Sequence, residues 1–295
     1  MFNESEVSKY KEIWKEFLKE RKLPNRCSGV SVISYNEFKD LRDKFDLNKA
    51  KELVSNLIDG KVLLVKGAYS KNEVNDIKSK VMKFWKENPD THYKMLEGCP
   101  DFHRNVTPQK TKYYSNGGVK HHSFYFRWNK DPYDIKNTFY ERWKYTKYIA
   151  GLNSNEYENN TPKDGVVDRI QIACWPKKCG GIEKHTDAYN NSYLVVGCYF
   201  SSLNNSDFST GGFYCVDKNN KNIYMEKSID VGDMGLFIPT IEHGVLPIDL
   251  ESEDNYDGYS GLGRWWCGLF SEDTDIKENR NTCIPLERSH SDRFV

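Results

Sequence analysis

The chain has 295 residues, of which 38% are hydrophobic and 29% charged, and its 43 basic side chains are balanced by 43 acidic ones. This length is enough to bury a sizeable core, and the zero net charge argues against a protein that binds nucleic acid by general electrostatic attraction. The N-terminus shows no signal-peptide pattern, the apolar runs are too short to cross a bilayer, and the eight cysteines form no C-x-x-C pair. We therefore expect a soluble, cytoplasmic protein with no nucleic-acid or membrane partner, whose cysteines are buried thiols.

Helical periodicity dominates the first half of the chain, where apolar residues recur at helical spacing in five segments. Ser70 and Glu73 form a capping box at the start of the fourth segment, and Asn88-Pro89 ends it. We expect these helices to pack against the outside of a later sheet. The five helical segments are 5–20, 38–45, 50–58, 70–88 and 136–151. Two strands are predicted among them, at 61–66 and 120–128.

From residue 166 the pattern changes to short strands separated by turns rich in Asn, Asp and Gly. No helical pattern separates these strands, which favours an all-β sandwich or barrel, and a jelly roll fits. The fold class is therefore mainly β with supporting helices. We expect one catalytic domain over 1–295, with a helical or irregular supporting region at 1–164, a core at 165–272 and a polar tail at 273–295. The predicted strands are 166–175, 193–200, 212–217, 222–226, 234–238, 241–248 and 264–270.

Three residues of this core carry metal-binding chemistry. His185 and Asp187 are two residues apart, a spacing that places both side chains on one face of an extended strand. His243 follows several strands later. Two imidazoles and one carboxylate form the facial triad of non-haem Fe(II) oxygenases, which leaves coordination positions open for a cosubstrate and O2. One alternative to an iron site is that the three are ordinary polar residues of the surface or core. Another is a zinc hydrolase or cupin-type binder, which would use the same ligands.

Further motifs surround the triad in a fixed order, and together they resemble the 2-oxoglutarate/Fe(II)-dependent dioxygenase superfamily, in its phytanoyl-CoA-dioxygenase-like or prolyl-hydroxylase-like forms. The resemblance covers about 165–272. It implies a double-stranded β-helix (a cupin-like jelly roll), with Fe(II), 2-oxoglutarate and O2 as cofactors. It also implies that His185, Asp187 and His243 are both the catalytic residues and the metal ligands. The motifs are Ile170-Gln171-Ile172, Gly211-Gly212-Phe213, Gly232-Asp233 and His243-Gly244-Val245.

By the same resemblance, Arg264 binds the carboxylate of 2-oxoglutarate that lies far from the metal. A guanidinium suits this role because it donates two parallel hydrogen bonds to a carboxylate. The gap between His243 and Arg264 is longer than is usual in the family, owing to an insert at 249–263. The alternative is an arginine paired with Asp or Glu at a strand end. Gln171 and Tyr199 are further candidates for cofactor contacts, although a structural glutamine and a packing tyrosine would look the same.

Candidate substrate contacts are His122, Phe124 and Trp175. The alternative for His122, and for its neighbour His121, is a partly exposed histidine pair on a supporting strand. The sequence contains no dinucleotide-binding, Walker, nucleophile-elbow or H-E-x-x-H motif, which removes those enzyme classes.

The resemblance implies that the enzyme oxidises an unactivated C–H bond while 2-oxoglutarate is decarboxylated to succinate and CO2. Hydroxylation is expected first, with cyclisation or desaturation left open, and the presence of Asp187 argues against halogenation. We expect a small-molecule substrate, as in natural product biosynthesis. A protein side-chain hydroxylase and a non-catalytic metal-binding jelly-roll module remain as alternatives, and no oligomeric state follows from the sequence.

Overall fold

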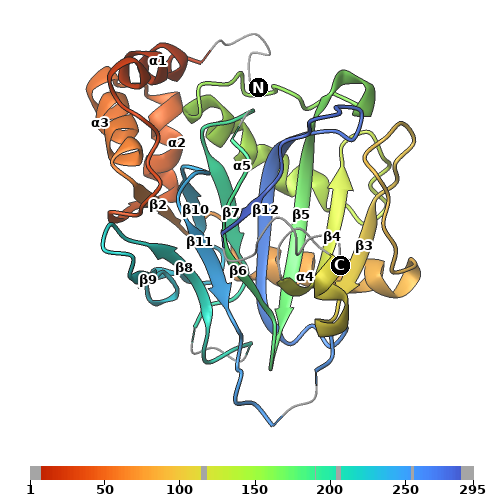
Figure 1. Cartoon of the computed structure of the whole chain (residues 1–295). Helices are drawn as coiled ribbons and strands as arrows, with labels where there is room; N and C mark the ends of the chain where they lie inside the picture. The colour runs from red at the N-terminus through yellow and green to blue at the C-terminus, as the bar shows by residue number, and fades with distance from the viewer. Residues whose placement is uncertain (1–7, 114–117, 190, 204–206, 254–255, 287–295) are drawn as a thin grey trace.

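The computed structural model describes residues 8–113, 118–189, 191–203, 207–253 and 256–286. Within them the chain forms two β-sheets that face each other, with helices along the outside of the larger sheet (Figure 1). The helices are α1 (Tyr10–Glu20), α2 (Tyr35–Asp43), α3 (Leu47–Ile58), α4 (Lys71–Glu87) and α5 (Lys136–Ile149). The strands are β1 (Gly29–Ser34), β2 (Lys61–Lys66), β3 (Phe102–Val106), β4 (Gly118–Phe126), β5 (Val166–Pro176), β6 (Gly181–Thr186), β7 (Val195–Tyr199), β8 (Gly212–Val216), β9 (Asn222–Tyr224), β10 (Met234–Phe237), β11 (His243–Leu246), β12 (Gly263–Asp273) and β13 (Ile284–Pro285).

The larger sheet has the order β1-β2-β10-β7-β12-β5-β4-β3, and the smaller sheet contains β6, β11, β8 and β9, with β13 paired to β6. Strand β4 pairs with β5 in the larger sheet and, through its first residues, with β6 in the smaller one. The two sheets are therefore joined along one side. This is the mainly β, jelly-roll architecture that the sequence predicted.

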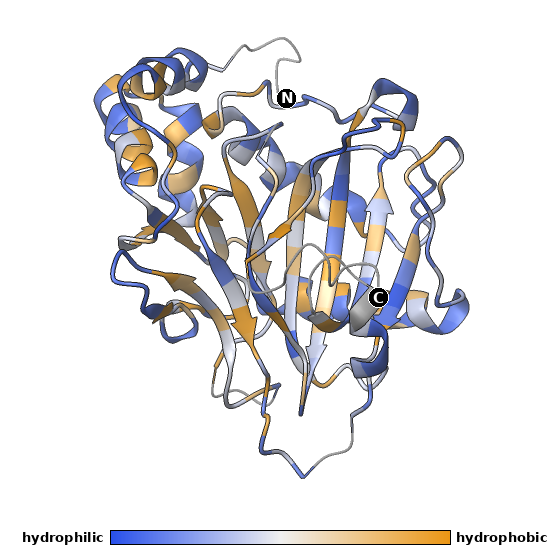
Figure 2. Ribbon diagram, viewed as in Figure 1, coloured by the Kyte–Doolittle hydropathy of each residue, from blue (hydrophilic) through white to orange (hydrophobic). Residues whose placement is uncertain are grey.

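The centre of the larger sheet is the antiparallel pair β5 and β12. Their register is unbroken, from Val166 paired with Asp273 at one end to Pro176 paired with Gly263 at the other. Side chains alternate along such a pair, so one face of it packs on the helices and the other faces the smaller sheet. On the helical side, Trp265 stacks on Trp85 of α4 with ring centroids 5.1 Å apart. The inner face is therefore free to carry polar residues. Figure 2 shows apolar residues concentrated in the central strands, while the helices present polar outer faces.

The predicted helices all form, with small changes at their ends. The capping box at α4 is complete, since the Glu73 amide donates to Ser70 Oγ (3.2 Å) and the Ser70 amide donates to the Glu73 carboxylate (2.8 Å). Helices α4 and α5 lie behind the larger sheet, and α1 to α3 gather at its β1–β2 end (Figure 1). They cover the outside of the sheet, as expected. Among the described residues, no helix combines the length and the apolar character that a membrane span requires.

Strand assignment before residue 165 was incomplete. Strands β1 and β3 were not predicted, and the sheet draws on β2 and β4 as inner members, because β2 pairs with β10 and β4 lies between β5 and β6. β2 and β4 take inner positions because each pairs with the edge of a core strand whose backbone groups would otherwise lack hydrogen-bond partners. The prediction for 222–226 was too long, because Glu226–Ser228 form a 3-10 turn. None of the eight cysteines forms a disulfide.

Candidate metal centre and its cavity

The two candidate histidines are brought together by antiparallel pairing of β6 and β11, in which His185 lies directly opposite His243. Their ring centroids are 4.3 Å apart. Asp187 follows the end of β6, and its amide donates to the Pro239 carbonyl (2.9 Å), which holds the carboxylate beside both rings. One ligand atom from each of the three residues lies within 4.8 Å of the other two.

The hydrogen bonds of the imidazoles select the nitrogen that faces the centre. His185 Nδ1 donates to the Glu183 carbonyl (2.7 Å), and His243 Nδ1 donates to the Ile241 carbonyl (2.8 Å). Both Nε2 atoms therefore keep a lone pair, and they point at Asp187, at 3.9 Å from His185 and 3.4 Å from His243. A backbone carbonyl on the far nitrogen is the usual way in which proteins orient a metal-ligating histidine.

Burial sets the protonation of these groups. It lowers the pKa of His185 to about 3, helped by the neighbouring His243, so this imidazole is neutral at physiological pH. Burial alone would raise the pKa of Asp187, but the adjacent His243 and His185 and the positive charge of Arg169 outweigh it and hold that pKa below its usual value. A neutral imidazole and an ionised carboxylate are the forms that bind a divalent metal.

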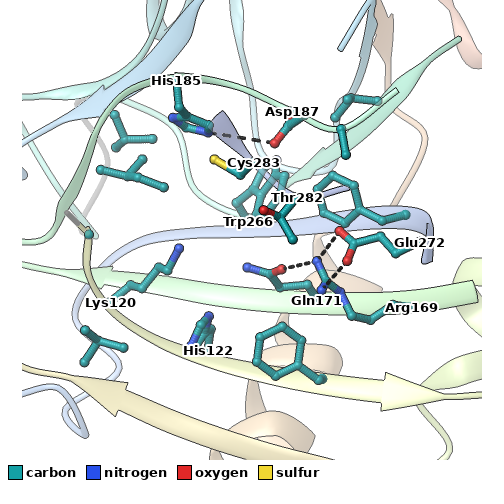
Figure 3. A pocket seen from close by; sticks show the side chains of 18 of the residues that line it. Lys120, His122, Arg169, Gln171, His185, Asp187, Trp266, Glu272, Thr282 and Cys283 are labelled. Atoms are coloured by element: carbon teal, nitrogen blue, oxygen red, sulfur yellow. Dashed lines mark hydrogen bonds and ion pairs between the residues drawn. The ribbon is translucent and has the colours of Figure 1, made fainter. Parts of the chain in front are cut away.

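A cavity of about 260 Å³ opens onto the triad, and every candidate residue from the sequence lines it. Its walls come from the inner faces of both sheets, and Figure 3 shows the residues of β4 and β5 facing the His185–Asp187 side across the cavity. The nine candidates are His185, Asp187, His243, Arg264, Gln171, Tyr199, His122, Phe124 and Trp175.

Arg264 is 1% exposed and lies at the start of β12, opposite Trp175 of β5. Its Nε donates to Glu226, which is itself buried and also accepts the Phe213 amide (2.7 Å). The arginine thus has the acidic partner that the alternative interpretation required. Its Nη2, however, is buried without a hydrogen-bond partner among the described residues, so the guanidinium retains donor capacity for a further anion.

The other cofactor candidates occupy different parts of the wall. Tyr199 lies beside Arg264, with the guanidinium carbon 5.6 Å from its ring centroid. Trp175, which we expected to contact substrate, flanks the same guanidinium at 5.2 Å. Gln171 is further from this end, and its amide oxygen accepts from Arg169 (2.9 Å). Tyr199 and Trp175 therefore share the Arg264 end of the cavity, whereas Gln171 belongs to a separate polar group.

The two adjacent histidines of β4 have different surroundings. His121 points to the helical side, where it stacks on Trp85 at 3.6 Å and donates to the Gly258 carbonyl (2.7 Å), so it is a core residue. His122 points into the cavity with Phe124 two residues on. The insert at 249–263 contributes the Gly258 carbonyl to this packing, so part of the long segment between His243 and Arg264 covers the helical side of β4.

Sequence reasoning missed several cavity residues. Lys120 lies two residues before His122 and on the same face of β4. Because side chains alternate along a strand, the candidate His122 could have identified Lys120 as a cavity residue from the sequence. Thr282 and Cys283 come from the tail, which returns to the site because β13 pairs with β6 at Thr186 and His185. No local pattern marks that return. The remaining lining residues that were not predicted include Arg104, Arg169, Trp266, Phe270, Glu272, Asp275 and Arg280.

Comparison with known proteins gives a likeness in structure only, since no family model and no curated protein matches the sequence. A thymine hydroxylase from Neurospora crassa, truncated at its C-terminus and in apo form, superposes with a TM-score of 0.50 at 11% identity, covering 82% of this chain and 94% of that one. The full-length N. crassa protein in complex with alpha-KG gives the same TM-score and identity, over 93% and 95% of the two chains. A Trichoplax adhaerens prolyl hydroxylase follows at a TM-score of 0.45 and 15% identity, over 79% and 96%.

The two N. crassa structures, each at a TM-score of 0.50, show that this chain shares the fold of that hydroxylase, one structure of which was solved in complex with alpha-KG. This confirms the double-stranded β-helix that the sequence motifs implied.

Proposed function

We propose that the chain is an Fe(II)- and 2-oxoglutarate-dependent oxygenase that oxidises an unactivated C–H bond of a small molecule, most simply by hydroxylation. The observation that carries this proposal is the triad. Two imidazole Nε2 atoms and a carboxylate converge at the wall of a cavity, on the fold of enzymes that use this chemistry. His185, Asp187 and His243 would hold the iron and leave its remaining positions facing the cavity.

The residues fit 2-oxoglutarate as well. Arg264 offers a buried guanidinium with an unused Nη2, and Tyr199 lies against it at the same end of the cavity. A dicarboxylate that reaches from the metal to this end would satisfy the orphaned donor, since a buried N–H without a partner costs about 1–3 kcal/mol. Glu226 fixes the guanidinium through Nε and leaves the other edge for the cosubstrate.

When bound, iron with 2-oxoglutarate and O2 supplies an oxidant able to break an unactivated C–H bond. The chain's own contribution is to bind, orient and exclude water. Asp187 contributes the negative charge that a ferrous ion requires, and the aromatic rings of Phe213 and Phe237 pack on His243 at 6.0 and 5.0 Å. These rings keep the histidine in place and the site apolar around the metal.

Cavity size supports a small-molecule substrate. A volume of about 260 Å³ lies just below the range of about 300–1,000 Å³ for small-molecule sites, and it must also hold the cosubstrate. The tail residues Thr282 and Cys283 form part of the wall that limits the cavity to this volume. A peptide would have to bind across the opening with one side chain inserted.

The test begins without oxygen. Adding Fe(II) and 2-oxoglutarate to the metal-free protein should produce the weak visible charge-transfer band of a chelated 2-oxo acid, and the Asp187→Ala variant should not show it. In air, the wild-type protein should release succinate. Screening metabolites and proline-containing peptides for compounds that speed this release would distinguish a small-molecule substrate from a peptide substrate. If the band is absent and no succinate forms, the oxygenase proposal is wrong.

A further inference from the structure

The wall of the cavity formed by β4 carries two polar side chains that nothing in the described part of the chain satisfies. Lys120 and His122 are 8% and 5% exposed, and both line the cavity. Among the described residues, both ring nitrogens of His122 are buried without a partner. The Lys120 ammonium makes no hydrogen bond or ion pair with a described residue, although the Asp187 carboxylate acts on it electrostatically from across the cavity. Figure 3 shows the two side chains projecting from β4 on the side of the sheet that faces the triad.

The other cations of the cavity have partners. Arg169 makes a two-pronged ion pair with Glu272 (2.6 and 2.7 Å), and Arg280 pairs with Asp275 (2.7 Å). Arg264 pairs with Glu226. Lys120 is different because its side chain is largely buried with no described carboxylate in contact with the ammonium, which is costly unless a ligand supplies the charge.

Burial lowers the pKa of Lys120 to about 8, so the ammonium form still predominates at neutral pH. Burial also lowers the pKa of His122 well below its usual value, and the nearby cations Lys120 and Arg104 add to the effect. The neutral imidazole keeps one N–H donor. The pair therefore presents one positive charge and two kinds of N–H donor from neighbouring positions on the same face of one strand.

A carboxylate matches this arrangement. One of its oxygens accepts from the ammonium and neutralises it, and the other accepts from the imidazole N–H. Rings of Phe124, Trp266 and Phe270 line the same cavity and would contact an apolar body attached to that carboxylate. The proposed cosubstrate end is separate, because Arg264 belongs to β12 and β5 lies between that strand and β4.

We propose that Lys120 and His122 form the substrate subsite, and that the substrate is a small organic acid with an apolar or aromatic body whose carboxylate binds there. This inference rests on the proposed function only in assuming that the neighbouring triad performs the reaction. It names the substrate class of that site.

The experiment uses matched acids and amides as probes. Acetate, benzoate and phenylacetate are titrated against the anaerobic protein loaded with Fe(II) and 2-oxoglutarate, and against the metal-free protein, alongside acetamide, benzamide and phenylacetamide. Binding is followed by the tryptophan fluorescence, since Trp175 and Trp266 line the cavity. We expect at least one acid to bind with a dissociation constant ten times or more below that of its amide.

Variants then test whether the preference for an acid over its amide depends on Lys120 and His122. Lys120→Met should abolish the advantage of acid over amide, and His122→Phe should reduce it several-fold. Lys49→Met removes an equal charge from the exposed surface of α3 and should leave the advantage intact. Circular dichroism checks that each variant is folded, and the wild-type comparison of acid with amide stands without any variant.

Three outcomes would overturn the proposal: no acid preferred over its amide, a preference that survives in Lys120→Met, or a Lys120→Met protein that loses affinity for 2-oxoglutarate and not for the probe acids. The last would make Lys120 an anchor for the cosubstrate. Failure of the proposed function is a separate observation, because it appears as a missing charge-transfer band and absent succinate whether or not the acids bind.

Discussion

Replacing Arg264 by methionine tests both the energetics and the role of the buried guanidinium. Arg264 and Glu226 are 1% and 3% exposed, and the carboxylate would keep only the Phe213 amide as a donor among the described residues. Removing one partner of a buried ion pair leaves an uncompensated charge and costs about 3–5 kcal/mol. Methionine retains most of the apolar stem, so packing is largely preserved.

The double variant Arg264→Met with Glu226→Gln separates charge from packing. Without a carboxylate there is no uncompensated charge, and replacing both members of a buried pair is often close to neutral. We therefore expect the double variant to recover most of the stability lost by the single one. Urea unfolding followed by circular dichroism measures the difference, provided that the slope of the transition is unchanged.

The same two variants report on 2-oxoglutarate. Both lack the guanidinium, so both should bind the cosubstrate about 2–4 kcal/mol more weakly, which is the scale for losing one partner of a buried charge pair. Stability and affinity should thus respond differently to the second substitution. The reasoning about Glu226 would be refuted if the free energy of unfolding of Arg264→Met were within about 1 kcal/mol of wild type. It would also be refuted if the double variant were as unstable as Arg264→Met. Unchanged affinity for 2-oxoglutarate would show that another residue anchors its carboxylate.

Three further outcomes are expected. Substitution of His185 or Asp187 by alanine should abolish iron binding, measured by metal analysis after dialysis, while the circular dichroism spectrum stays that of the folded protein; retained iron would contradict the ligand assignment. Lys147→Met should destabilise the protein by about 3–5 kcal/mol in urea, because it leaves the fully buried Asp168 without its cation; a change below about 1 kcal/mol would contradict this. Burial lowers the pKa of His121 to about 3, so between about pH 6.5 and 3 the unfolded chain binds a proton that the folded one excludes. Its contribution to stability is complete above that window and falls by about 1.4 kcal/mol per pH unit within it; His121→Gln should reduce the measured slope by that amount, and an unchanged slope would show that the imidazole titrates in the folded protein.

Much of the centre could be read from the sequence because its signals are local. His185 and Asp187 are two residues apart at the end of one strand, where Asp187 directly follows β6. The alternation along β5 already placed Gln171 and Trp175 on one face. The capping box of α4 depends on residues three apart. In each case the interacting groups are near neighbours in the chain, so the geometry of the helix or strand determines which side chains meet.

Only the tertiary structure decided the rest. Glu226 reaches Arg264 across 38 residues, β4 becomes the strand that joins the two sheets, and the tail returns to pair with the strand that carries His185. None of these contacts has a periodic signal, because which strands become neighbours depends on packing of the whole chain. The unsatisfied pair Lys120 and His122 illustrates the difference. Alternation places the two side chains on one face, but only the assembled cavity showed that both line it and that the ring nitrogens of His122 lack a partner among the described residues.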